Sequence, residues 1–254
     1  MMDYRQKIYT TYVSQKTQAS GYQYNQAGYE LWSRATRARL KGWLPADRAL
    51  PILDMGCGPG NLLYLLAQDG YSNLTGIDLS TEQINLARQW CPTATILQGD
   101  VQEFLQQFTG HFWLITGFDI MEHFRKDEQL PFLARVIAAL RPGGRLILQT
   151  PNAESPMAGT VAYGDFTHEW FFTPASLADL LRLSGFERYE ARPSNPYVHG
   201  LKSALRRILW GGVKSGLMLW NLTEVGHRGS GVYTRVFVAT AVKHCGELSR
   251  SQTS

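Results

Sequence analysis

Short apolar runs alternate with stretches of helical periodicity along the middle of the chain. Each run is bounded by Gly, Pro, Asn or Asp, which is typical of a buried strand, and the stretches between them repeat apolar residues at helical spacing. We therefore expect strands at 51–55, 73–78, 94–98, 112–118 and 144–150, and helices at 60–69, 80–90, 101–107 and 126–140. Strands and helices that alternate in this way predict an α/β fold, in which helices cover both faces of a doubly wound, mostly parallel sheet.

The pattern changes beyond residue 150. Residues 151–172 predict an irregular insertion, after which Thr173-Pro174 opens a helix that Gly185 ends. Two more strands are predicted at 186–191 and 232–242. A long segment is therefore inserted between the last two strands.

The predicted domain organisation follows from these elements. We expect an N-terminal helical cap at 1–50, loose over 1–20 and helical over about 21–42, a core at 51–192, an amphipathic insertion at 193–230, a last core strand at 231–243 and a flexible tail at 244–254. A chain of 254 residues with 44% hydrophobic content can bury one α/β core, and no second domain is required.

The composition also bears on the compartment. No apolar run reaches the roughly 18–20 residues of a membrane span, and the first residues lack a hydrophobic signal region. The cysteines Cys57, Cys91 and Cys245 show no C-x-x-C spacing, which predicts a reducing compartment and no structural zinc. We therefore expect a cytoplasmic protein.

Charge is distributed unevenly along the chain. Residues 1–50 hold eight Lys/Arg and three Asp/Glu, residues 201–254 hold eight and two, and the middle holds nine and sixteen. The two basic flanks predict contact with an anionic substrate, a membrane surface or nucleic acid. The alternative is a solvated basic face.

The run from Ile52 to Asn61 carries the clearest chemical signal. Its Gly56, Gly58 and Gly60 stand at every second position after an apolar strand. Glycines let a ligand approach the backbone closely, and a helix that opens at Asn61 offers unpaired N–H groups and the positive end of its dipole. The spacing G-x-G-x-G differs from the dinucleotide fingerprint G-x-G-x-x-G, which argues against a nicotinamide cofactor but still predicts a nucleotide-type cofactor loop.

Carboxylates follow three successive strands beside this loop. Asp54 precedes the first glycine by two residues, Asp78 is spaced to bond a ribose diol, and Asp100 is placed to meet an adenine edge. Each also has an interpretation as a helix cap or helix start. Independent caps need not fall at the ends of three successive strands, so we favour a shared binding site.

With these motifs the sequence resembles the class I S-adenosylmethionine (SAM) dependent methyltransferases over roughly residues 50–190. The resemblance implies a Rossmann-like, seven-stranded sheet with an antiparallel edge strand, and SAM as the cofactor. It also implies that the glycine loop binds the methionine and ribose parts of SAM, that Asp78 holds the ribose hydroxyls and that Asp100 and Val101 contact adenine. The expected cofactor-binding residues are Asp54, Gly56, Cys57, Gly58, Gly60, Asn61, Asp78, Leu79, Asp100, Val101 and Phe118.

The chemistry is expected after the fourth strand, in the run from Gly117 to Phe124, because ligands of open α/β sheets bind outside the carboxyl ends of strands. Methyl transfer is an in-line displacement, so the largest contribution is to hold the acceptor and the methyl group about 3–3.5 Å apart. A hydroxyl acceptor also benefits from a base. His123, with Glu122 beside it, is the first catalytic candidate.

The same run implies a metal site by resemblance. Asp119-Ile120-Met121-Glu122-His123 and the later segment 166–174 resemble the ubiquinone-pathway O-methyltransferases and the small-RNA terminal 2′-O-methyltransferases. In the latter family an acid, a Glu-His pair and a later His gather a divalent ion, which implies Asp119, Glu122, His123 and His168 as ligands of Mg²⁺ or Mn²⁺ here. Asp119 stands where those families often have Glu, with a shorter reach. The alternative is that Glu122 and His123 cap a helix and hydrogen-bond the insertion.

The motifs Glu122-His123, Thr150-Pro151-Asn152 and 165–169 together resemble methyltransferases found with bacterial polysaccharide genes. This resemblance implies O-methylation of a hydroxyl on a sugar or glycan, or on another small molecule. Two alternatives stay open: an RNA methyltransferase that uses the basic flanks, and a non-catalytic SAM-binding protein. Affinity that falls steeply with salt is the signature of the former.

Segment 201–220 lies outside the minimal fold. Its apolar residues recur at helical spacing beside two tryptophans, Arg206, Arg207 and Lys214. Such a helix predicts peripheral contact with the inner face of a membrane, and the alternative is a helix that packs on the core or on a dimer partner. The three glycines at 211, 212 and 216 weaken any single long helix.

Overall fold

The computed structural model describes Tyr4, Ile8 and residues 25–245. The predicted loose segment 1–20 therefore lies almost wholly outside the described residues, as do residues 246–254 of the predicted tail. The strands are β1 (Ile52–Met55), β2 (Leu74–Asp78), β3 (Thr95–Gln98), β4 (Phe112–Phe118), β5 (Leu140–Pro151), β6 (Phe186–Pro193) and β7 (Val236–Lys243). The helices are α3 (Gln26–Leu40), α4 (Asn61–Gln68), α5 (Thr81–Trp90), α6 (Val101–Leu105), the 3-10 turn η1 (Met121–His123), α7 (Lys126–Ala139), α8 (Ala158–Ala162), α9 (Pro174–Leu183) and α10 (Leu201–Val225).

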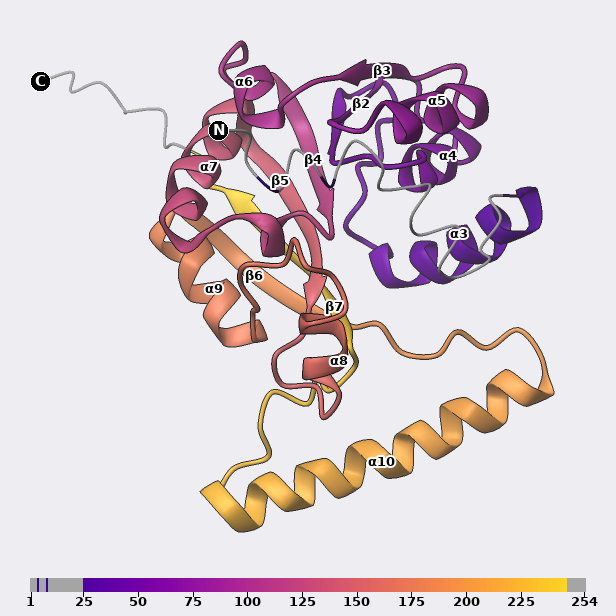
Figure 1. Ribbon diagram of the computed structural model, residues 1–254, viewed down its shortest axis with the longest axis vertical. Coiled ribbons are helices and arrows are strands. Elements are labelled where there is room, and N and C mark those ends of the chain that lie inside the picture. Colours follow the sequence, from indigo (N-terminus) through magenta and orange to yellow (C-terminus); the bar gives the residue numbers. More distant parts are fainter. Residues whose placement is uncertain (1–3, 5–7, 9–24, 246–254) are drawn as a thin grey trace, which may run out of the picture.

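The strands of the described chain form one seven-stranded sheet in the order β3-β2-β1-β4-β5-β7-β6 (Figure 1). Strands β1 to β5 pair in parallel, and β7 runs antiparallel to both of its neighbours, β5 and β6. The predicted Rossmann-like, doubly wound α/β fold is confirmed. The antiparallel strand β7, although last in chain order, lies one place inside the edge that β6 forms.

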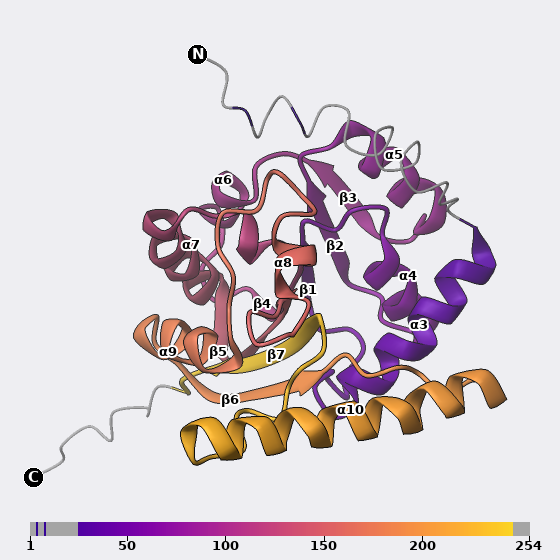
Figure 2. The same cartoon turned by 60° about the horizontal axis from the view of Figure 1, so that its bottom comes forward.

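The sheet separates two apolar cores, because successive side chains of a strand point to opposite faces. Leu53 and Met55 of β1 pack into the core beneath α6, α7 and α9. Ile52 packs into the other core, beneath α3, α4 and α5. Figure 2 shows these two groups of helices on either side of the sheet. Parallel strands buried on both faces explain why the sequence shows continuous apolar runs rather than strict alternation.

Two strand starts differ from the prediction by four residues each. Strand β5 begins at Leu140 rather than at 144, because Phe112 of β4 already pairs with Leu140. Strand β7 begins at Val236 rather than at 232. The preceding residues are held instead by Asn152, whose Nδ2 donates to the carbonyls of Val232 (2.8 Å) and Thr234 (2.9 Å). The Asn152 side chain thus supplies hydrogen bonds to residues for which the apolar pattern predicted pairing with a neighbouring strand.

Two predictions about the insertions also need correction. The irregular segment 151–172 contains the short helix α8, and its ends are drawn together where Ala153 N donates to the carbonyl of Phe172 over 2.8 Å. The segment expected at 201–220 is one unbroken helix through Val225, despite glycines that cost about 1 kcal/mol each in a helix interior. It ends at Gly226, which adopts φ +77°, a conformation that favours glycine.

Candidate active site

The loop after β1 is a cradle of backbone atoms. Gly56, Gly58 and Gly60 have φ of +62°, +53° and +85°, a region that residues with a Cβ rarely adopt. At Gly60 a Cβ would stand only 2.9 Å from the Cys91 sulfur, so packing also requires glycine there. Asn61 follows as the first residue of α4. The predicted turn, free of side chains, is what the structure shows.

Asp78 ties this loop to the end of β2. Its Oδ2 accepts a hydrogen bond from Gly58 N (2.9 Å), and its Oδ1 accepts one from Ser80 N (2.8 Å). Burial raises the pKa of Asp78, while these backbone bonds oppose the shift. Asp78 is not the cap of α5, since the Ser80 hydroxyl accepts from Gln83 N at that position. Leu79 follows as an exposed side chain.

Asp54 lies beneath the same loop, almost fully buried. Its Oδ1 accepts a hydrogen bond from the Thr116 hydroxyl over 2.7 Å. Burial raises the pKa of Asp54 to about 7, and nearby Asp78 adds to the rise against the Thr116 bond. Burial likewise raises the pKa of the Cys57 thiol well above its usual value. Thr116 was not among the predicted site residues, and no motif in the sequence marks it.

Asp100 has the helix-start role that the sequence left open. Its Oδ1 accepts from Gln102 N (2.6 Å) and Glu103 N (3.3 Å), so it caps α6. Val101 is half-buried as the first residue of that helix. Asp78 pairs in register with Gln98, two residues before Asp100. The ends of β2 and β3 therefore lie side by side at the carboxyl edge.

Helix α3 contacts the loop from above. The Tyr29 hydroxyl donates to the carbonyl of Pro59 over 2.7 Å, and its ring stacks on Trp90 with centroids 4.7 Å apart. Trp32 lies 6.1 Å, between ring centroids, from Phe118 at the end of β4. The described part of the N-terminal segment thus lies over both the glycine loop and the next strand end.

Glu122 is the most unusual carboxylate in the described chain. It follows β4 in the turn η1 and is 0% exposed. Its Oε2 accepts a hydrogen bond from the Thr150 hydroxyl (3.2 Å), whereas its Oε1 is buried without a partner among the described residues. Burial, reinforced by the nearby charge of Asp119, raises the pKa of Glu122 well above its usual value. An unsatisfied buried oxygen of this kind calls for an explanation.

Two imidazoles meet this carboxylate, and their hydrogen bonds assign their tautomers. The Thr167 hydroxyl donates to Asp165 Oδ1 (2.6 Å), so it accepts from His123 Nδ1 at 3.0 Å. His168 Nδ1 lies 3.1 Å from the carbonyl of Val161, which can only accept. Both protons are thereby assigned to Nδ1, and the lone pair of each ring is on Nε2.

Glu122, His123 and His168 each offer one ligand atom, and these atoms all lie within 4.8 Å of one another. A carboxylate oxygen and two imidazole nitrogens, with the second nitrogen of each ring hydrogen-bonded to the protein, form the donor set of many divalent metal sites. The orphaned Oε1 of Glu122 completes the fit. The structure therefore brings together three of the four predicted ligands.

Asp119 lies outside that cluster. Its side chain is exposed, its φ is +53°, and its Oδ2 accepts from Gln149 Nε2 over 3.0 Å. Gln149 Oε1 in turn accepts from Arg39 of α3 over 3.2 Å. A non-glycine residue in this region is uncommon and is often found at functional sites. Asp119 thus links the cap helix to the site instead of joining the three ligand atoms.

The capping alternative for Glu122 and His123 holds only in part. Helix α7 begins at Lys126, and its first turn is closed by Glu128, whose Oε2 accepts from Arg125 N over 2.8 Å. Neither Glu122 nor His123 takes that place. His123 does hydrogen-bond the insertion, through Thr167. Thr167 was missed as a candidate although it lies inside the segment 165–169 that the sequence singled out.

The metal-type cluster and the glycine loop lie against each other. The Cδ1 of Ile120, in the turn that carries Glu122, stands 3.4 Å from where a Cβ would be at Gly56. Strands β1 and β4 are neighbours in register, with Met55 beside Gly117. The predicted cofactor residues and the predicted catalytic residues therefore share one edge of the sheet.

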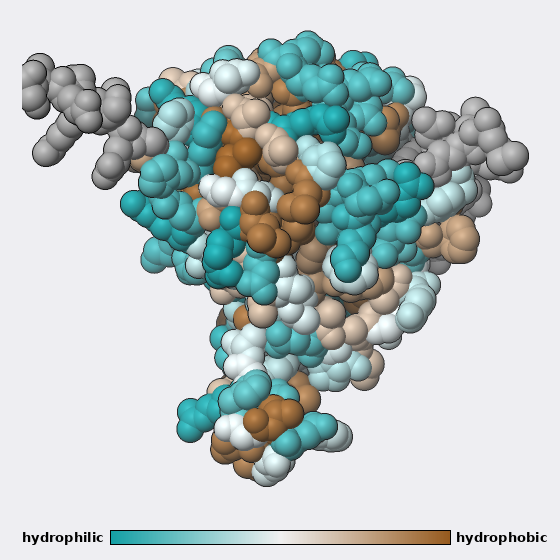
Figure 3. All heavy atoms as spheres, turned by 90° about the vertical axis from the view of Figure 1, so that its left-hand side faces the viewer, coloured by the Kyte–Doolittle hydropathy of each residue, from teal (hydrophilic) through white to brown (hydrophobic). Residues whose placement is uncertain are grey.

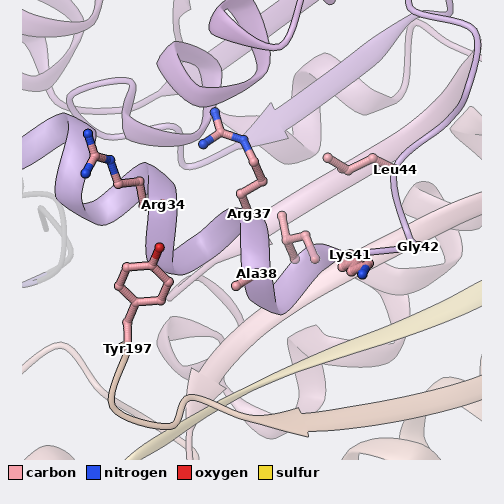
Figure 4. A pocket seen from close by; sticks show the side chains of 8 residues that line it. Arg34, Arg37, Ala38, Lys41, Gly42, Leu44 and Tyr197 are labelled. Carbon is pink, nitrogen blue, oxygen red and sulfur yellow. The ribbon is translucent and has the colours of Figure 1, made fainter. Parts of the chain in front are cut away.

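A cavity of about 470 Å³ lies elsewhere, between α3 and the segment after β6 (Figure 4). Arg34, Arg37, Lys41 and Tyr197 are among its lining residues. Helical periodicity places these α3 residues on the face opposite Tyr29, Trp32 and Arg39, the face that contacts the site. This cavity is therefore separate from the glycine loop and from the ligand cluster.

Comparisons with known proteins agree with this arrangement. A family model described as a methyltransferase domain matches residues 24–191, which is more than half of the chain. The chain is 33% identical over 120 residues to a trans-aconitate 2-methyltransferase of Paracidovorax citrulli, covering 46% of this chain and 45% of that protein. It is 29% identical over 170 residues to a ubiquinone biosynthesis O-methyltransferase of Aromatoleum aromaticum, covering 58% and 70%. The alignment with the first of these spans about half of that relative's length.

Solved structures give the same fold. A SAM-dependent methyltransferase from Archaeoglobus fulgidus superposes with a TM-score of 0.60 at 16% identity, covering 83% of this chain and 94% of that one. The magnesium protoporphyrin IX methyltransferase of Synechocystis, solved with bound SAH, superposes with a TM-score of 0.55 at 18% identity, covering 93% and 95%. At these identities the likeness is one of fold.

Proposed function

The chain belongs to the class I SAM-dependent methyltransferases, and from this premise we propose that it transfers the methyl group of SAM to a hydroxyl oxygen of a sugar, a glycan or another small molecule. The observation that carries the proposal is the cluster of Glu122, His123 and His168 at the end of β4. A cluster of this kind next to the cofactor loop provides groups for the acceptor, which methyl transfer requires.

Binding of SAM is supported by the loop after β1. Its glycines let a ligand approach the backbone closely, and the carboxylate of Asp78 lies at the end of the neighbouring strand, where a ribose diol is expected. Tyr29 and Trp32 of α3 lie over this loop and over the end of β4. Aromatic cover of this kind excludes water from the reacting groups, which strengthens their electrostatic interactions.

The acceptor side offers His123 and Glu122. The lone pair of His123 is assigned to Nε2, where it can take the proton of a hydroxyl or bind a cation. Glu122, His123 and His168 would hold Mg²⁺ or Mn²⁺ in the second case, and the bound ion would lower the pKa of an acceptor hydroxyl. In either case Thr167 orients His123, and Thr150 orients Glu122.

The relatives favour oxygen as the acceptor atom. The ubiquinone relatives are named O-methyltransferases, and their identity to this chain reaches 33% over 109 residues. The trans-aconitate relatives favour a second candidate, a carboxylate oxygen, at comparable identity. Both candidates keep the acceptor a small molecule and differ in the group that is methylated.

The test is transfer of labelled methyl from SAM into a fractionated extract, with and without EDTA. We expect label in small molecules or lipid-linked glycans, and loss of label with EDTA if the cluster works through a cation. Label that is stable to base hydrolysis identifies an ether, whereas labile label identifies a carboxylate ester. Label in nucleic acid would replace the proposal by the RNA alternative, and an absence of label would favour a non-catalytic SAM-binding protein.

Variants of the cluster separate chemistry from cofactor binding. His123→Ala should lower turnover by about 100-fold, because a positioned base contributes at least that much, while SAM affinity measured by calorimetry stays within a few fold. His111→Ala is the matched control, since His111 is exposed at the opposite end of β4. Full activity of His123→Ala would remove the catalytic role of this residue.

A further inference from the structure

Helix α10 exposes large apolar side chains to solvent. Of its 25 residues, Ser203 alone is buried, and the helix stands clear of the sheet at the ends of two extended segments (Figure 1). A surface helix of a globular protein normally turns its apolar stripe toward the core. Here the apolar stripe points to solvent.

The face turned toward the protein is attached by polar contacts, beside the half-buried Trp210, Leu217 and Met218. Asn221 Nδ2 donates to the Tyr233 hydroxyl (2.8 Å), and Trp210 Nε1 donates to Asn195 Oδ1 (3.0 Å). Ser203 accepts from the backbone N of Gly200 over 3.0 Å at the start of the helix. These bonds attach α10 to the segments on either side of it, so the direction of its outer face is defined.

The outer face carries large apolar side chains at helical spacing. Leu201 is 91% exposed, Ile208 is 71% exposed and Trp220 is 66% exposed. Leu205, Leu209 and Leu219 share this face and are also more than half exposed. Hydrophobic atoms are visible on the lobe that α10 forms at the bottom of Figure 3. We name this set the outer face of α10.

Basic residues border the outer face. Helical periodicity places Lys202 and Arg206 on one side of it, whereas Arg207 and Lys214 lie on the side of Asn221 and Ser203. Glu224 is the helix's single acidic residue. Long basic side chains beside an apolar stripe can extend their charges toward anionic head groups while their stems cover apolar surface. The charge of the helix therefore complements an anionic surface.

The position of α10 relative to the site follows from strand register. Pro193, the last residue of β6, pairs with Phe237, and Val236 at the start of β7 pairs with Pro151 at the end of β5. The two connections to α10 thus leave the sheet at the edge where β5 ends. This is the edge that carries Glu122 and the insertion.

We propose that the outer face of α10 docks the protein on an anionic lipid surface. The helix lies flat in the interface, with its apolar side chains among the acyl chains and its cations at the head groups. In the described chain no helix is both long and apolar enough to span a membrane. Docking in this way turns the carboxyl edge of the sheet, and the acceptor site with it, toward the lipid surface. The proposal depends on α10 alone and holds whichever acceptor is methylated.

Charge favours lipid over a second copy of the chain as the occupant. In an antiparallel pair of α10 helices, the cations of one copy would lie opposite the C-terminal half of the other, where Glu224 is the single acidic residue. Such a pair offers each copy at most one opposite charge. An anionic surface instead offers a partner to each cation that reaches it, for about fivefold in affinity each.

Flotation of the full chain with vesicles tests the proposal. We expect the wild-type protein to float with vesicles that contain phosphatidylglycerol in phosphatidylcholine, and to bind pure phosphatidylcholine more weakly. Ile208→Glu with Leu219→Glu should lower vesicle affinity by about 100-fold, since two exposed apolar anchors are lost. Leu130→Glu with Leu183→Glu is the matched control, because these leucines are exposed on α7 and α9; it should bind like the wild type.

The second experiment removes positive charge from α10. Lys202→Gln with Arg206→Gln should lower affinity for the anionic vesicles by about 25-fold and leave binding to phosphatidylcholine unchanged. Unchanged SAM affinity, measured by calorimetry, would show that each variant is folded. Because vesicle binding is measured without methyl transfer, its outcome does not depend on the proposed function. A wild-type chain that does not float overturns the proposal. If light scattering also shows a dimer that Ile208→Glu with Leu219→Glu dissociates, the outer face belongs to a second copy.

Discussion

The two halves of the carboxyl edge differ in how their carboxylates are satisfied. In the half formed by β1, β2 and β3, Asp78 and Asp100 accept from backbone amides and Asp54 accepts from Thr116. In the half formed by β4 and the insertion, Glu122 keeps a buried oxygen without a partner among the described residues. The carboxylates of the first half are thus paired within the protein, whereas in the second half ligand atoms of Glu122 and two histidines lie within 4.8 Å of one another.

From this difference we infer a separate role for each half. A network whose groups are already bonded is rigid and preorganised for one ligand of defined shape, here the cofactor. A buried carboxylate with an unsatisfied oxygen costs folding free energy, and such a cost persists where function requires it. The acceptor half is therefore where variants should separate turnover from binding.

The strongest test of the contrast is Glu122→Gln. We expect kcat/KM to fall by about 100- to 1,000-fold and Mn²⁺ binding to be lost, because the charged ligand is removed from a buried site. SAM affinity should stay within about threefold, and calorimetry measures both. Glu103→Gln, an exposed carboxylate on α6, is the control. A loss of SAM affinity as large as the loss of activity would show that the two halves are one unit.

Asp78→Ala should weaken SAM binding and leave metal binding unchanged. Removal of its carboxylate frees Gly58 N and Ser80 N and takes away the expected ribose contact, so the Kd for SAM should rise by about 10- to 100-fold. Mn²⁺ binding by the cluster should not change. Asp179→Ala on α9 serves as control, since its side chain is 70% exposed. Unaltered SAM affinity in Asp78→Ala would contradict the cofactor assignment of this half.

Thr167→Val tests the orientation of one imidazole. The change keeps the shape of the side chain and removes the hydroxyl that accepts from His123 Nδ1. We expect Mn²⁺ affinity to fall by about tenfold, the usual effect of losing a partner of a ligating histidine. Thr160→Val in α8, away from this bond, is the comparison. Equal metal affinities in both variants would show that Thr167 does not orient His123.

The smallest effect is expected for stability at Asp54. A carboxyl whose folded pKa is raised to about 7 stabilises the fold fully below its ordinary value of 3.8, and that stability is lost as the pH rises through 7. Asp54→Asn cannot ionise, so its melting temperature should rise relative to that of the wild type between about pH 4 and 7 and keep a constant lead above that range. Thermal melts of both proteins across this range, without cofactor, give the result. Parallel curves would show that Asp54 does not titrate in this way.

The cofactor half was predictable because its signals are local. The positive φ of Gly56, Gly58 and Gly60 follows from a turn contained within one short run of sequence. The carboxylates Asp78 and Asp100 stand at strand ends, and apolar runs mark such ends directly. Even here the partner of Asp54 was not predicted, because Thr116 comes from a neighbouring strand 62 positions away.

The acceptor half depends on tertiary contacts that no local pattern encodes. His123 and His168 meet only because the insertion folds back on the end of β4, with Glu169 N donating to the carbonyl of Glu122 over 2.7 Å. The start of β7 was misplaced for the same kind of reason, since Asn152 binds the residues before it. Helical periodicity also predicts an apolar stripe on α10 but does not predict whether that stripe faces the core or solvent.

The place of β7 in the sheet has a consequence for the order of folding during synthesis. In the described chain β6 pairs with β7 alone, yet β6 leaves the ribosome some 40 residues before β7 does. Strands β1 to β5 can assemble as they emerge, because each strand after β1 finds a neighbour among residues already made. Strand β6 must wait with both edges unpaired, which is when a chain is most prone to pair with another. Synthesis that stops before residue 236 should therefore yield an aggregation-prone five-stranded intermediate rather than a smaller working enzyme.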